Sequence, residues 1–149
     1  MALVTTAGTE TIRTVMMDDV DSTTTVVIAG EQHHIYTVLS IVFHAAVWQA
    51  SGNFVKMIVQ GYDSKGGTTN SGMTVFKEPM KDDETFVFND KFSFNGFEPI
   101  SFTGPLSTVA HHDAIASQGS GVSQELRIYT QHADDQGHLI LTYIDQNNE

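Results

Sequence analysis

Phenylalanine recurs at even positions through residues 85–95, and this alternation constrains the fold more than any other feature of the chain. The residues concerned are Phe86, Phe88, Phe92 and Phe94. Side chains alternate between the two faces of a strand, whereas a helix would spread them around its axis. The segment is therefore predicted to be a strand with one face on a core. Because Asp90 interrupts the apolar face, we expect either a bulge at Asn89-Asp90 or a tight hairpin turn there, and we prefer one bent strand.

The composition extends this prediction to the whole chain. Val, Ile and Thr contribute 14, 10 and 17 of the 149 residues, whereas Leu contributes only 6. Branched side chains suit a pleated surface and lose rotamer freedom in a helix. Turn residues divide the sequence into about eight or nine short strands. We therefore expect an all-β protein, an antiparallel β-sandwich of jelly-roll or immunoglobulin-like type, with a small barrel as the alternative.

Residues 1–31 differ in character from the rest. They contain eight Thr, no aromatic residue and an acidic cluster at Asp18-Asp19-Val20-Asp21. We interpret them as an extended N-terminal arm that adds strands to a partner, and residues 32–149 as one β-sandwich domain. The apolar residues expected to bind the partner are Ile12, Val15, Met16, Val26, Val27 and Ile28. An ordinary edge strand would show the same pattern, so this alternative stays open.

Longer apolar runs predict the centre of the sheets. His33–Trp48 has neither Gly nor Pro and is apolar on both faces, as in a central strand that is covered on both sides, although a helix is the competing interpretation. Turn chemistry at residues 49–53 predicts that this strand forms a hairpin with Phe54–Tyr62. Asp63–Gly72 is a flexible loop by composition, and a second hairpin is expected between Glu125–His132 and His138–Ile144. Residues 105–121 read as a long excursion with a short helix.

Charge and cysteine content exclude several classes of function. The formal net charge is −11, from 18 acidic and 7 basic residues, and a nucleic-acid surface needs clustered Lys and Arg. The absence of Cys excludes disulfides and thiolate metal sites, and favours folding in a reducing compartment. The N-terminus lacks the pattern of a signal peptide, and no apolar run approaches the ~20 residues of a membrane helix. We expect neither a nucleic-acid nor a membrane partner.

Histidine is the one residue type that suggests chemistry. The candidates for a metal site are the adjacent pairs His33-His34 and His111-His112. Neighbouring side chains of a strand point to opposite faces, so one ion would not bind both members of a pair. A symmetric trimer could still bring one His per chain together on its axis. Hydrated surface histidines are the preferred interpretation, and we predict no catalytic, cofactor or metal site.

Two aromatic residues beside predicted turns suggest another class of function. Trp48 and Tyr62 could stack on a sugar, as in a carbohydrate-binding β-sandwich, although aromatic residues at such places more often cap the core. No further polar constellation accompanies them.

The pattern as a whole resembles the small virion structural proteins of tailed bacteriophages, and most closely the capsid decoration, or cement, proteins. The resemblance depends on the Thr-rich N-terminal segment and on residues 33–44, 84–94 and 139–146. It implies a non-enzymatic β-sandwich or barrel, often a homotrimer, that binds the major capsid protein or other virion subunits. The implied location is the virion, assembled in the host cytoplasm. A tail or neck adaptor component would look similar.

Overall fold

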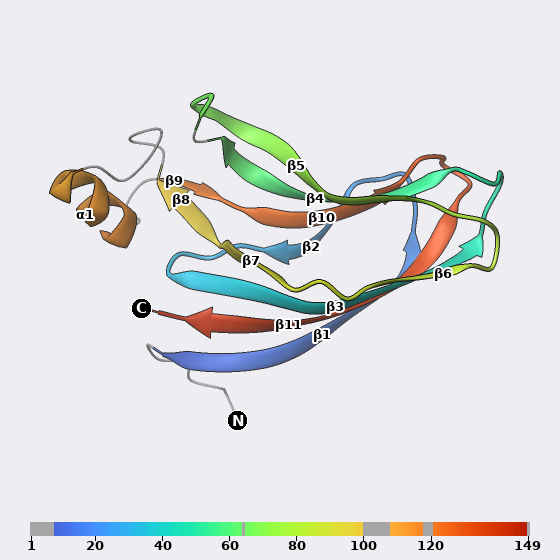
Figure 1. The fold of residues 1–149 in the computed structure, drawn as a ribbon, viewed down its shortest axis with the longest axis horizontal. Coiled ribbons are helices and arrows are strands. Elements are labelled where there is room, and N and C mark those ends of the chain that lie inside the picture. Colours follow the sequence, from blue (N-terminus) through green and yellow to red (C-terminus); the bar gives the residue numbers. More distant parts are fainter. Residues whose placement is uncertain (1–7, 64, 100–107, 118–120, 149) are drawn as a thin grey trace.

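Two antiparallel β-sheets face each other in the computed structural model, which describes residues 8–63, 65–99, 108–117 and 121–148 (Figure 1). The first sheet contains β1 (Thr9–Val20), β11 (Gln136–Asn147), β3 (His34–Val47), β6 (Thr85–Phe88) and β7 (Phe92–Asn95). The second contains β2 (Thr25–Ala29), β10 (Glu125–Thr130), β4 (Phe54–Asp63) and β5 (Thr68–Pro79). The predicted antiparallel β-sandwich is confirmed.

The order of strands identifies the type of sandwich. The order is β1-β11-β3-β6 in the first sheet, where β7 also pairs with β3, and β2-β10-β4-β5 in the second. The chain therefore crosses from one sheet to the other between β1 and β2, and again at each of the next two connections. The late strands β11 and β10 insert between the early ones. This is the order of a jelly roll, one of the two sandwich types that the sequence predicted.

Both predicted hairpins are wrong, because their strands lie in different sheets. β3 pairs with β11, β6 and β7, while β4 pairs with β10 and β5. β10 and β11 are separated in the same way. A short polar turn allows the chain either to return beside itself or to cross to the other sheet, so turn chemistry does not decide between them. The hairpin that does form joins β4 to β5, whose residues 68–72 the sequence placed in a loop.

The buried carboxylate of Asp135 fastens two of these crossings together. One carboxylate oxygen accepts the backbone N–H of Gln49 at 2.7 Å, and the other accepts Asn53 Nδ2 at 3.0 Å. The Asp135 side chain is fully buried. The loop from β3 to β4 is thereby tied to the loop from β10 to β11.

The alternating phenylalanines line the core as expected. β6 and β7 both pair with β3, Phe88 opposite Ile41 and Phe92 opposite Val38. Three residues of this segment, 89–91, therefore face only two of β3. This is a bulge, and the hairpin alternative at Asn89-Asp90 is not formed.

Residues 9–29 belong to the sandwich in this structure. β1 pairs with β11 at the edge of the first sheet, and β2 pairs with β10 at the edge of the second. Val20, Val27 and Ile28 contribute to the common core. The segment therefore takes the form of edge strands, the alternative that the sequence left open, because its inward-facing apolar residues pack between the two sheets. A partner-binding role for it stays a prediction.

The excursion between β7 and β10 lies at one end of the sandwich (Figure 1). It contains β8 (Phe97–Pro99), α1 (Val109–Ser117) and β9 (Gly121–Ser123), and β8 pairs with β9. The expected short helix is thus present. Within the described residues, no helix is long and apolar enough to span a membrane.

Candidate interaction surface

β3 is apolar on both faces, but the structure covers only one of them. The buried residues of this strand are Tyr36, Val38, Ile41, Phe43 and Ala45. They change from even to odd positions at Leu39, because the pairing with β11 shifts register there. The opposite side of the first sheet, here called the outer face, has no second layer of described residues against it. The predicted coverage on both sides is therefore wrong.

A cross-strand row of apolar side chains runs over the outer face. Met16 on β1 lies opposite Ile140 on β11, which lies opposite Val42 on β3, which in turn lies opposite Val87 on β6. The exposed fractions of Met16, Ile140 and Val87 are 76%, 42% and 48%. A second group, near the other end of the strands, contains Ile12, Ile35 and Ile144. Soluble proteins rarely leave contiguous apolar patches of this kind uncovered unless something binds there.

The polar groups between these apolar side chains satisfy one another. The hydroxyls of Thr14 and Thr142 lie 3.1 Å apart, and those of Thr37 and Ser93 lie 2.9 Å apart. None of the described residues at the outward positions of β1, β11, β3, β6 and β7 is Lys or Arg. A partner that docks on the apolar row would therefore strip water mainly from uncharged groups, whereas Glu10, near the end of β1 on the same face, carries an exposed carboxylate.

Two imidazoles border the outer face at one end. His44 and His138 are cross-strand partners with ring centroids 6.1 Å apart. His138 Nε2 lies 3.0 Å from a carboxylate oxygen of Asp18, and His44 Nε2 lies 3.1 Å from one of Asp83. The charged partner of each imidazole is thus a carboxylate.

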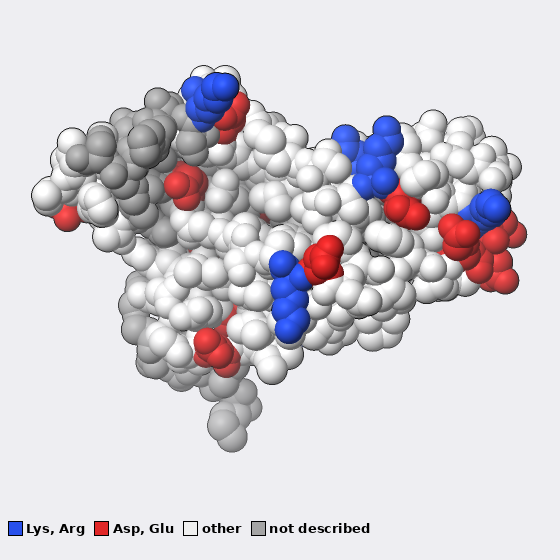
Figure 2. Space-filling view, viewed as in Figure 1, with Lys and Arg blue, Asp and Glu red and all other residues white. Residues whose placement is uncertain are grey.

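Charges elsewhere occur in small mixed groups. Figure 2 shows that each basic group on the viewed side lies against an acidic one, with wide uncharged areas between them. Acidic side chains gather at the end of the molecule where β6 begins. The overall charge of −11 is therefore not spread as one continuous field on this side.

The predicted partner-binding residues divide between the surface and the core. Ile12 and Met16 project from the outer face, and Val26 on β2 is 37% exposed. Val15 packs against the core from the inner side of β1. Val27 and Ile28 are buried between the sheets, so they leave the set of candidates for binding a partner. Alternation along β1 explains the division, because neighbouring residues turn to opposite faces.

The predicted aromatic pair does not form one site. Trp48 is buried, with its ring against Phe43 and its indole N–H donating to the Asn53 carbonyl. Tyr62 is half-buried at the far end of β4, roughly 25 Å along that strand from Phe54. Trp48 therefore caps the core, as the more usual role of such residues suggests.

The candidate histidines are also separated. His34 begins β3, while His111 and His112 lie on α1. His34 Nδ1 lies 2.6 Å from an Asp145 oxygen, and its Nε2 lies 3.4 Å from a Glu31 oxygen. The part of the chain that the structure describes has no group of three or more His, Cys, Asp or Glu residues that could hold a metal ion.

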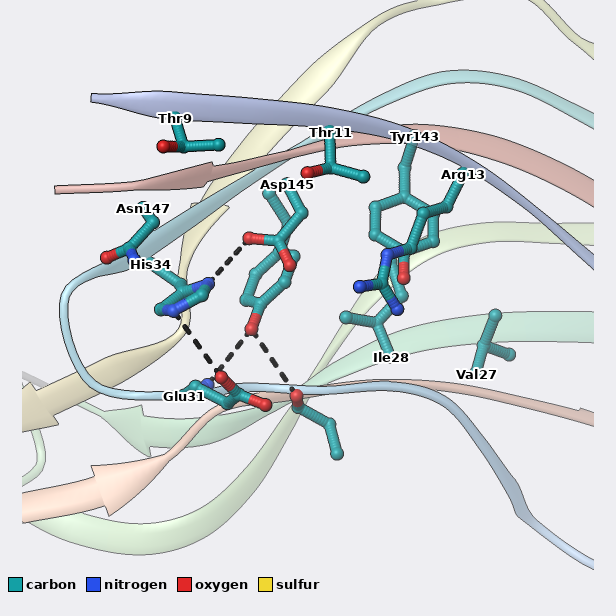
Figure 3. Close-up of a pocket in the computed structure, with 12 residues that line it drawn as sticks. Thr9, Thr11, Arg13, Val27, Ile28, Glu31, His34, Tyr143, Asp145 and Asn147 are labelled. Atoms are coloured by element: carbon teal, nitrogen blue, oxygen red, sulfur yellow. Dashed lines mark hydrogen bonds and ion pairs between the residues drawn. The ribbon is translucent and has the colours of Figure 1, made fainter. Parts of the chain in front are cut away.

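A polar cavity of about 230 Å³ opens between the edges of the two sheets, where β1 lies opposite β2 (Figure 3). Sequence reasoning missed it, because its walls come from four strands far apart in the sequence. Figure 3 shows His34 between Asp145 and Glu31 on one side and Arg13 beside Tyr143 on the other. The Tyr36 hydroxyl accepts the Glu31 backbone N–H at 3.1 Å. Burial raises the pKa of the Tyr36 and Tyr143 hydroxyls above the ordinary value, although the nearby Arg13 lowers that of Tyr143 in part.

Comparisons with known proteins leave the family open. No protein-family model and no curated protein sequence matches the chain. A solved structure from work on Bacillus endospore appendages, described as a novel family of disulfide-linked pili, is 11% identical with a TM-score of 0.47, over 100% of this chain and 97% of that chain. Chains of infectious bursal disease virus, Gt and Gx strains, are 10% and 11% identical with TM-scores of 0.32 and 0.33. The matches cover 98% and 99% of this chain, but only 35% and 40% of the two viral chains.

Proposed function

We propose that the chain is a non-enzymatic structural protein that binds, through the outer face of its first sheet, to the subunits of an assembled particle. In its finer form the proposal is a decoration protein of a bacteriophage capsid, whose partner is the major capsid protein and whose location is the virion. The observation that carries it is the uncovered apolar row from Met16 to Val87. A central strand that is apolar on both faces favours a second covering layer, and a partner subunit supplies it.

The magnitude of the available stabilisation suits a protein that binds in many copies. Ile12, Met16 and Ile140 are 70%, 76% and 42% exposed, and complete burial of one such side chain contributes about 1.5–3 kcal/mol, so these three contribute about 3–5 kcal/mol. The cost of association consumes most of this for one isolated copy. Simultaneous contacts by several linked copies, as in a homotrimer, convert the weak contact into stable retention. Binding to the assembled lattice in preference to free subunits then stabilises the assembly.

Particle binding by matched surface variants tests the proposal. The double substitution Met16→Glu and Ile140→Glu places two carboxylates in the apolar row, and we expect it to reduce binding by at least about tenfold. Met73→Glu is the control, since Met73 is 55% exposed on the other sheet. The assay is cosedimentation with capsids and with tails, prepared separately from the phage-producing culture. Equal binding by the double variant and the control would contradict the docking surface.

The same experiment separates decoration from a tail or neck role. Retention on capsids supports a decoration protein, and retention on tails or necks alone supports the adaptor alternative. Carbohydrate binding has no comparable support, because Trp48 is buried and Tyr62 lies at the other end of β4.

A further inference from the structure

β1 is a long and regular sheet edge. Its residues 9–17 pair with β11 in unbroken register, from Thr9 opposite Asn147 to Met17 opposite Leu139. β1 is the last strand of its sheet, so alternate N–H and C=O groups along its other side have no strand of the described residues to bond. Such an edge is a template for an added strand.

The other sheet edges carry features that oppose strand addition. β5 ends in Lys77-Glu78-Pro79, and the β6–β7 edge is broken by the bulge at 89–91, which contains Asp90 and Lys91. β2 has only five residues. Residues 9–17 contain neither Pro nor Lys, and their register does not shift. Of the four edges of the two sheets, β1 is therefore the least protected.

The surroundings of β1 specify the side chains of an added strand. On one face they would extend the outer face beside Ile12 and Met16, which favours apolar residues. On the other face they would turn toward the cavity between β1 and β2, whose wall on this side contains Thr11 and Arg13. A strand that fits must therefore alternate apolar and polar side chains.

Arg13 supplies a positive charge on that polar side, whereas the carboxylates of the same cavity, Glu31 and Asp145, both lie against His34. Its guanidinium lies beside the Tyr143 hydroxyl and lowers the pKa of that hydroxyl, and no carboxylate of the described residues forms an ion pair with it (Figure 3). A guanidinium has several N–H donors, so most of those of Arg13 are available to a ligand. Carboxylates are the side chains that bind a guanidinium through two parallel hydrogen bonds.

We propose that the free edge of β1 accepts an extended segment of a partner subunit, whose side chains alternate between apolar residues on the outer face and carboxylate residues beside Arg13. This inference rests on the proposed function in one respect, because it assumes that the segment belongs to another subunit of the particle. A second copy of β1 is a poorer occupant, because antiparallel pairing centred on residues 12–14 brings two Arg13 guanidinium groups opposite or diagonal to each other.

Binding of short synthetic peptides to the full chain tests the proposal. The probe is a capped peptide in which Val alternates with Glu and Thr, and the matched control replaces each Glu with Lys. We expect the Glu peptide to bind at least about tenfold more tightly, and to slow amide hydrogen exchange at alternate residues of 9–17. Arg13→Glu should reverse the preference between the two peptides. Urea unfolding of the Arg13→Glu variant, monitored by Trp48 fluorescence, establishes that this variant is folded.

Several results would overturn the proposal. They are equal binding of the two peptides, protection at the β5 or β6–β7 edge instead of β1, unchanged preference in Arg13→Glu, and no binding at millimolar concentration. Concentration-dependent dimerisation through β1 in the absence of peptide would assign the edge to a second copy. If the peptides do not bind β1 but the Met16→Glu and Ile140→Glu variant loses particle binding, the proposed function stands and the edge site is wrong. If the peptides bind β1 but the variant still binds particles as the control does, the edge site stands and the proposed docking surface is wrong.

Discussion

Replacing Asp135 by Ala should destabilise the fold more than any single surface change. Asp135 is fully buried, and its carboxylate accepts one hydrogen bond from the Gln49 backbone N–H and one from the Asn53 side chain. A hydrogen bond to a charged group contributes about 1.5–3 kcal/mol net, so the loss of both costs about 4 kcal/mol of the free energy of unfolding. Asp135→Asn keeps one acceptor oxygen but turns an NH₂ group toward a donor, and should cost about 2 kcal/mol.

Urea unfolding measures this cost directly, because the chain contains a single Trp. Trp48 is buried, and it is the neighbour of Gln49, so its emission reports the loss of structure at these crossing loops. With a slope of about 2 kcal/mol per molar urea, Asp135→Ala should lower the midpoint by about 2 M. Asp134→Asn is the matched control, and its exposed side chain should leave the midpoint within about 0.3 M.

A midpoint lowered by less than about 0.5 M in Asp135→Ala, or by no more than in Asp134→Asn, would refute the stabilising role of the two Asp135 hydrogen bonds. Either result would mean that water or a neighbouring group satisfies the Gln49 and Asn53 donors in the variant. An unchanged slope in all variants is required for the comparison, since a changed slope indicates a different unfolded or native ensemble.

Three further predictions concern packing, pH and the outer face. Gly137→Ala should lower the free energy of unfolding in urea by about 2–3 kcal/mol, because the added Cβ would overlap the Phe43 ring and lie 2.7 Å from the His44 carbonyl oxygen. A urea midpoint equal to that of the natural chain would contradict this close packing. Burial raises the pKa of the Tyr36 and Tyr143 hydroxyls, so the unfolded chain loses these protons at lower pH than the folded chain does. Their contribution to the free energy of unfolding is therefore fully present below about pH 10. Above that pH it falls by at most about 1.4 kcal/mol per pH unit for each group. Urea midpoints between about pH 8 and 11 test this, and a decline as steep in Tyr36→Phe as in the natural chain would count against it. Met16→Glu should change the urea midpoint by no more than about 0.3 M, because this side chain is 76% exposed, and a larger loss would show that the outer face contributes to the fold of the isolated chain.

Local pattern was sufficient to predict the class of fold and most of the strands, although residues 68–72 of β5 were placed in a loop. The phenylalanines of residues 85–95 predicted a strand on the core with an irregularity at Asn89-Asp90, and the structure places all four against the core. The residue period of a strand is a property of neighbouring residues alone, so it can be read from the sequence. In β1 the sequence predicted Ile12, Val15 and Met16 as partner-binding residues from an apolar run; Ile12 and Met16 lie on the outer face, whereas Val15 packs against the core.

Pairing between distant strands could not be predicted in this way. The run from His33 to Trp48 was assigned to a hairpin with Phe54–Tyr62, but β3 and β4 lie in opposite sheets. Ile140, Val42 and Val87 were absent from the predicted surface, because they join Met16 only through the registers of three strand pairs. The cavity beside Arg13 was missed for the same reason.

The sequence by itself determined that this chain is a β-sandwich with apolar side chains on both faces of its longest uninterrupted strand. Only the tertiary structure decided which of those faces is covered and which residues share the uncovered one. The physical reason is that alternation sets the direction of a side chain relative to its own strand, whereas burial depends on which other strands arrive on either side. The second sheet, β2-β10-β4-β5, covers the inner face of β3, whereas β1, β6 and β11 supply the residues that share its outer face. No local pattern records the meeting of these distant segments.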